Sequence, residues 1–118
     1  MNVMIEISKR VLTMVRFSLE AEISRIDRVN LVGEKDWPED FDPNDSYIYK
    51  QILDAIDIGK DNGDYISVEL GIGKHNWFIS DAIANYVSKN RSSIRHEDLK
   101  LLKDIFEQNR ISGRQFPK

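Results

Sequence analysis

The chain has no cysteine, only two histidines and only three prolines among its 118 residues. Without cysteine it can form neither disulfides nor thiolate metal sites. Its apolar runs are a few residues long, whereas a helix that crosses a bilayer needs about 20 apolar residues. Residues 1–6 lack the basic end and apolar run of a secretory signal. We therefore expect a cytoplasmic protein that holds no cofactor and spans no membrane.

Charge is distributed unevenly along a chain whose length is typical of a single domain. The net charge is −3, but residues 34–64 contain ten acidic and three basic residues, whereas residues 65–118 contain six acidic and nine basic ones. Such a concentration of negative charge indicates a positively charged partner. It argues against a nucleic acid at residues 34–64, because phosphates would be repelled there.

The spacing of apolar residues predicts a long first helix. From Val3 to about Leu31 apolar side chains recur every three or four positions, and Gly33 is a typical helix stop. Val3, Ile5 and Ile7 also alternate, so a short opening strand is the alternative.

Three further helices follow from the same spacing. The second is expected over residues 46–58 and the third, the most apolar and so the most central, over residues 76–88. A last helix is expected after Ser93 as its cap. Its inward face comprises Leu99, Leu102, Ile105 and Phe106.

The segment Tyr65–Leu70 fits two structures. It alternates polar with apolar residues and is rich in β-forming residues, as in a strand. A lone strand needs a partner, however, and Asp64 can instead cap a short helix that ends near Gly71. We predict the helix here, with the strand as the alternative.

Together these segments predict a mainly α-helical fold. We expect one domain over residues 1–118, a bundle of about five helices, with an acidic loop at 34–45 and a frayed basic tail at 111–118. The alternative is an α+β fold with a short strand at 65–70.

Several segments have a superficial likeness to known sites. The turn Lys60–Asp64 lacks oxygen ligands at the spacing of a calcium loop, and Gly71–Lys74 lacks the spacing of a phosphate-binding P-loop. His75 and His96 have no nucleophile nearby and fit the starts of helices. Basic residues of the last helix alternate with acidic ones, as on a solvated helix face. We therefore expect no metal site, no direct contact with nucleic acid and no catalytic residue, so the protein is not expected to be an enzyme.

The stretch Glu34–Tyr49 contains six carboxylates, one lysine, two prolines and four aromatic residues. Carboxylates steer a basic partner, aromatic side chains supply contact area, and prolines reduce the entropy lost on binding. The plain alternative is a solvated loop whose Trp37 and Phe41 pack onto the core. We predict a partner-binding surface made of Glu34, Asp36, Trp37, Glu39, Asp40, Phe41, Asp42, Asp45, Tyr47 and Tyr49.

The acidic loop followed by Ser46-Tyr47-Ile48-Tyr49 resembles the acidic helix and tyrosine pair of colicin nuclease immunity proteins. The small size and the absence of an active-site motif are also similar to the immunity proteins of contact-dependent growth inhibition systems. The resemblance implies a bacterial inhibitor that neutralises a cognate basic, nucleic-acid-cleaving toxin by covering it. The alternative is a helical regulator or adaptor that contacts another protein through the face of residues 77–87 or through the basic tail.

Overall fold

The computed structural model describes residues 2–39, 41–71, 74–109 and 115–117, and its first element is a strand. Strand β1 (Asn2–Ser8) pairs antiparallel with β3 (Tyr65–Gly71), which pairs antiparallel with the short β2 (Lys60–Asn62). The sheet order is therefore β1-β3-β2. The helices predicted at the start of the chain and at residues 65–70 are wrong in these two stretches, where the alternative α+β fold is observed.

Alternation of side chains explains why β1 and β3 pair. Ile5 lies opposite Val68, and Ile7 lies opposite Ile66, so one face of the sheet is apolar and turned toward the helices. Met4, on the opposite face, is 60% exposed. Each strand thus supplies the partner that the other lacks, across about sixty residues of sequence.

Four α-helices, rather than about five, follow in the described part of the chain. They are α1 (Leu12–Leu31), α2 (Asp45–Asp57), α3 (Lys74–Asn90) and α4 (His96–Gln108), with the 3-10 turns η1 (Lys9–Val11), η2 (Glu34–Asp36) and η3 (Arg91–Ser93). The predicted helices at 46–58 and 76–88 are confirmed as α2 and α3 to within two residues at each end. None of the helices in these ranges is long and apolar enough to cross a membrane.

The start of the last helix differs from the prediction. Ser93 lies in η3 and its hydroxyl donates to the carbonyl of Asn90, while the residue before α4 is Arg95, in extended conformation. Ser93 therefore does not cap α4, because it lies three residues before the first helical residue, His96, and Arg95 occupies the cap position.

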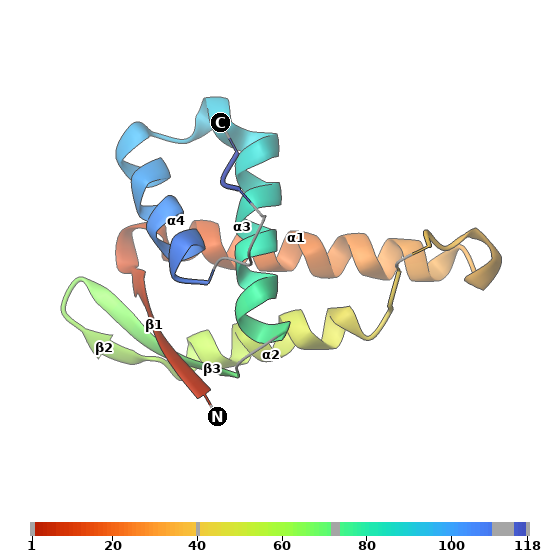
Figure 1. The fold of residues 1–118 in the computed structure, drawn as a ribbon, viewed down its shortest axis with the longest axis horizontal. Helices are drawn as coiled ribbons and strands as arrows, with labels where there is room; N and C mark the ends of the chain where they lie inside the picture. Colours follow the sequence, from red (N-terminus) through yellow and green to blue (C-terminus); the bar gives the residue numbers. More distant parts are fainter. Residues whose placement is uncertain (1, 40, 72–73, 110–114, 118) are drawn as a thin grey trace.

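Helix α3 is the centre of the molecule (Figure 1). It crosses α1 at a steep angle, with α4 beside its C-terminal half and the sheet near its N-terminal end. Ile79, Ile83 and Val87 are completely buried, and the hydroxyl of Ser80 donates to the carbonyl of Phe106 at 3.0 Å. The tail predicted at 111–118 lies outside the described residues except for 115–117, where Phe116 packs edge-on against Phe106.

Helices α1 and α2 form an antiparallel hairpin whose free end projects from this core (Figure 1). Arg16 pairs with Asp57 at its base, and the hydroxyl of Ser46 donates to Asp27 at 3.2 Å toward its free end. Ile26 is the last buried residue of α1. The projection agrees with a radius of gyration of 14.3 Å, slightly above the roughly 13.5 Å expected of a compact domain of this length.

Candidate functional site

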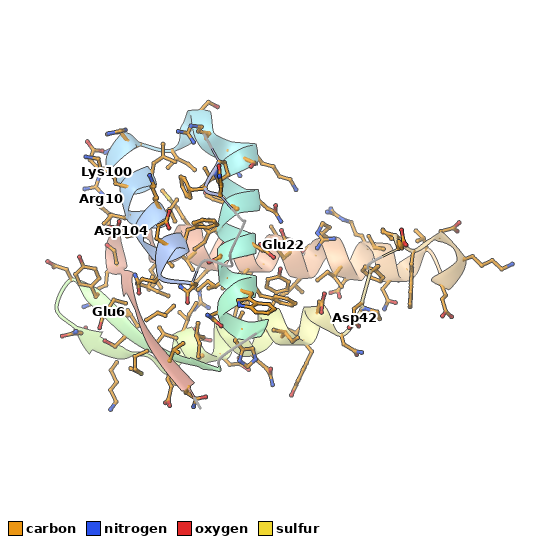
Figure 2. All side chains as sticks on the ribbon, viewed as in Figure 1. Glu6, Arg10, Glu22, Asp42, Lys100 and Asp104 are labelled. Carbon is orange, nitrogen blue, oxygen red and sulfur yellow. The ribbon has the colours of Figure 1, made fainter. Side chains whose placement is uncertain are left out.

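The predicted binding residues lie mostly at the free end of the α1–α2 hairpin, which we call the acidic tip and define as residues 31–39 and 41–45. Asp40, one of the predicted residues, lies outside the described residues. Figure 2 shows Asp42 at this end of the molecule, remote from Lys100 on α4. The acidic tip thus stands apart from the sheet and from α4.

A succession of tight turns shapes the acidic tip. Gly33 has a φ of 91°, a conformation that residues with a side chain rarely adopt, and it redirects the chain from α1 into η2. The amide of Phe41 then donates to the carbonyl of Pro38 at 3.0 Å. Asp42 accepts the amide of Asn44 through its side chain at 2.9 Å, which leads the chain into α2. Consecutive hydrogen-bonded turns restrict the backbone conformations of the tip.

The four aromatic residues of the predicted site separate into three environments. Trp37 and Phe41 are half-buried, with ring centroids 5.1 Å apart in an edge-to-face arrangement, and Phe41 packs against the core. Tyr47 is 64% exposed. Tyr49 is 5% exposed and its ring stacks on Phe78 at 5.0 Å. The aromatic surface at this end of the hairpin therefore consists of the exposed parts of Trp37 and Phe41 in the tip and of Tyr47 next to it.

Tyr49 is among the residues predicted to form the binding surface, but its side chain is buried. Residues two positions apart on a helix point about 200° away from each other, so Tyr47 and Tyr49 cannot share one exposed face of α2. Burial, followed by the charges of Glu22 and Asp81, raises the pKa of the Tyr49 phenol above its ordinary value. Tyr49 therefore belongs to the core beneath the hairpin.

Two apolar residues missed by the sequence analysis join the acidic tip. Leu31 is 85% exposed and Val32 is 57% exposed, immediately before the acidic loop. Leu31 falls five positions after the buried Ile26, off the three-to-four-residue repeat that turns side chains inward, and this offset was the signal available in the sequence. Exposed apolar surface next to a charged loop is typical of a protein-binding site.

The acidic residues of segment 34–64 divide into two groups. At the base of the hairpin, Asp57 pairs with Arg16 and Asp61 pairs with Lys9, whose hydrogen bond and charge lower the pKa of Asp61. At the tip, Glu34, Asp36 and Glu39 are exposed and form no ion pair with any described residue. Negative charge is therefore partly compensated at the base, where Asp54 and Asp64 remain exposed, and is left available at the tip.

A buried polar cluster connects the hairpin to α3. Glu22 is 3% exposed and lies where α1 crosses α3 (Figure 2). Its carboxylate accepts hydrogen bonds from Asn85 at 2.7 Å and from Arg25 at 2.9 Å. Both carboxylate oxygens are thus engaged. The cluster fixes α1 against α3 and so positions the hairpin; its carboxylate is buried, while the side chain of Arg25 is 46% exposed.

The two histidines also have defined places. His75 accepts the amide of Gly71 through Nδ1 at 3.2 Å, and its Nε2 lies 2.8 Å from Oε1 of Gln51, so it connects β3 to α2. His96 is exposed at the start of α4. Within the described ranges, no group of three or more His, Asp or Glu could hold a metal ion.

Comparison with protein-family models, with curated protein sequences and with solved structures gave no match for this chain. The function is therefore inferred from the geometry of the chain itself.

Proposed function

We propose that this protein is a small protein-binding inhibitor, an immunity protein that neutralises a cognate basic toxin by covering its active or substrate-binding surface with the acidic tip. The observation that carries the proposal is the juxtaposition, at the free end of the hairpin, of the exposed, unpaired Glu34, Asp36 and Glu39 with the exposed Leu31 and Val32. Charge, which steers association, and apolar area, which supplies contact surface, coincide there and project from the body.

The charge of the tip suggests a nucleic-acid-cleaving toxin. Nucleases bind the phosphate backbone through Lys and Arg side chains. A tip rich in carboxylates competes for the same cations, and it accelerates association because opposite charges steer the two proteins together. Binding of this kind should weaken as salt concentration rises.

The shape of the tip supports insertion into a concave surface. The turns that follow Gly33 restrict the loop before binding, so little conformational entropy is lost on association. Leu31, Val32 and Tyr47 would provide the apolar contacts, surrounded by the carboxylates.

An adaptor that binds through the apolar face of α3 receives less support. Ile79, Ile83 and Val87 on that face are completely buried, and only Trp77, at the start of the helix, is 44% exposed. A partner could reach this face only by opening the core.

The test is affinity capture from cells of the native host followed by mass spectrometry, with two variants of equal charge change. The tip variant carries Glu34→Gln, Asp36→Asn and Glu39→Gln. The control carries Glu20→Gln, Asp54→Asn and Asp104→Asn, three exposed carboxylates located elsewhere. We expect a basic protein to be captured by the parent and the control, and at least tenfold less of it by the tip variant. Equal capture by both variants would remove the acidic tip as the interface.

A further inference from the structure

A second surface feature, separate from the acidic tip, lies on the opposite side of the molecule. A groove with a cavity volume of about 540 Å³ runs between α4, η3 and the C-terminal segment 115–117. This volume falls in the range of small-molecule sites, about 300–1,000 Å³. Lys100, which lines the groove, and Asp42, which belongs to the tip, lie on opposite sides of α3 in Figure 2.

One wall of the groove is a basic stripe of α4. His96, Lys100 and Lys103 follow at intervals of four and three residues, so they share one face of the helix. Arg91, from η3, adds a guanidinium. Three permanent cations therefore line one cavity, and Glu107 is the only carboxylate among the described residues that line it.

Two of the acidic residues of α4 are turned away from this stripe. Glu97 and Asp98 are turned toward Arg10 of η1, with Arg10 Nε 2.6 Å from the Asp98 carboxylate. Within the described ranges, Arg91, Lys100 and Lys103 form no ion pair. Glu97 and Asp98 are thus directed at Arg10, whereas Lys100, Lys103 and the single carboxylate of Glu107 face the groove.

The other wall of the groove is apolar and held in place. Leu99, Phe116 and Pro117 line it. Phe116 packs against the buried Phe106 with ring centroids 5.6 Å apart, and Arg91 Nη1 donates to the carbonyl of Pro117 at 2.6 Å. That bond orients the guanidinium and leaves its other N–H groups to point at a ligand.

We propose that this groove binds a small organic phosphate with a planar ring, of the mononucleotide class. Arginine and lysine are the usual ligands of phosphate oxygens, arginine through paired N–H groups and lysine as a point charge. The wall of Leu99, Phe116 and Pro117 suits a ring, and the volume exceeds the space needed by an inorganic anion. The inference is independent of the inhibitor function, because it concerns other residues.

The test is isothermal titration calorimetry of the full chain with ADP, adenosine and inorganic phosphate. Amide chemical shifts measured by NMR show which residues each ligand affects. ADP is expected to bind saturably and with a strong dependence on salt, while adenosine and inorganic phosphate each bind at least tenfold more weakly. Amides of α4 and of residues 115–117 should shift with ADP, while those of the acidic tip should not.

A pair of charge-matched variants assigns the binding to the groove. Lys100→Ala with Lys103→Ala should weaken ADP at least tenfold, because each removes a charge-assisted contact. Lys50→Ala with Lys60→Ala, at exposed positions elsewhere, should leave it unchanged. All four lysines are exposed, so folding is expected to survive, and circular dichroism checks it. The proposal is overturned if ADP shows no saturable binding, if inorganic phosphate binds as tightly as ADP, or if the two variants lose equal affinity.

Discussion

Two alanine substitutions on α1, five residues apart, should have very different effects on stability. Ile26 is 2% exposed and is the last buried residue of the helix, whereas Leu31 is 85% exposed at its end. If the hairpin projects as described, Ile26→Ala should be strongly destabilising and Leu31→Ala nearly neutral.

The structure sets the size of both effects. Ile26→Ala removes three buried carbons, which costs about 2.4 kcal/mol in transfer free energy alone. The cavity left behind raises the expected loss to about 2.5–4 kcal/mol. Leu31→Ala removes side chain that is already in water, so the free energy of unfolding should change by no more than about 0.5 kcal/mol.

Urea unfolding followed by helical circular dichroism measures both changes, since the slope m should stay constant while the midpoint shifts. A loss for Leu31→Ala as large as that for Ile26→Ala would refute the reasoning. It would mean that the end of α1 is packed against other residues, and the tip could not offer Leu31 to a partner.

Three further substitutions probe the core and the sheet. Because burial raises the pKa of Tyr49, the folded state holds this proton more tightly than the unfolded chain does. Its contribution to stability is complete below about pH 10 and is lost as the pH rises above that value. The melting temperature of Tyr49→Phe should therefore fall less than that of the parent between about pH 9 and pH 11. An equal fall in both proteins would contradict this. Gly63→Ala should cost about 1–2 kcal/mol in urea unfolding, since Gly63 has a φ of 70° in the β2–β3 turn; a neutral effect would show that the turn relaxes. The side-chain amide of Gln108 accepts a hydrogen bond from the backbone amide of Glu6 and donates one to the Glu6 carbonyl. Gln108→Glu replaces the donating NH2 group with a carboxylate oxygen, so it should lower the free energy of unfolding by about 1–3 kcal/mol. An equal urea midpoint would show that this pairing contributes nothing to stability.

Local patterns in the sequence were sufficient to predict the helices α2 and α3. Helical spacing and flanking glycines placed α2 and α3 correctly, because both elements depend on residues close together in the chain. The pairing of β1 with β3 depends on residues about sixty positions apart, and neither strand is stable without the other. Because each segment taken alone also fits a helix, the sequence predicts helix at both strands.

The composition of the acidic tip could be predicted from the sequence, but the burial of every side chain near it could not. The charge of residues 34–45 and the offset of Leu31 from the helical repeat are visible in the sequence, whereas the burial of Tyr49 depends on its packing against Phe78 of α3. Likewise, Asp57 at the end of α2 and Asp61 in β2 look equivalent in the sequence to the acidic residues of the tip, although Arg16 and Lys9 pair with them. Tertiary contacts, which no local pattern encodes, decide which charges remain available.

The most direct measurement of the central claim is site-specific photo-crosslinking in cells of the native host. A photo-reactive amino acid replaces Leu31 in one variant and Ile58 in the other, two apolar positions with matched exposures of 85% and 83% at opposite ends of the hairpin. The inhibitor proposal predicts a covalent adduct with a basic protein from position 31 and none from position 58. An adduct from position 58 alone would contradict it.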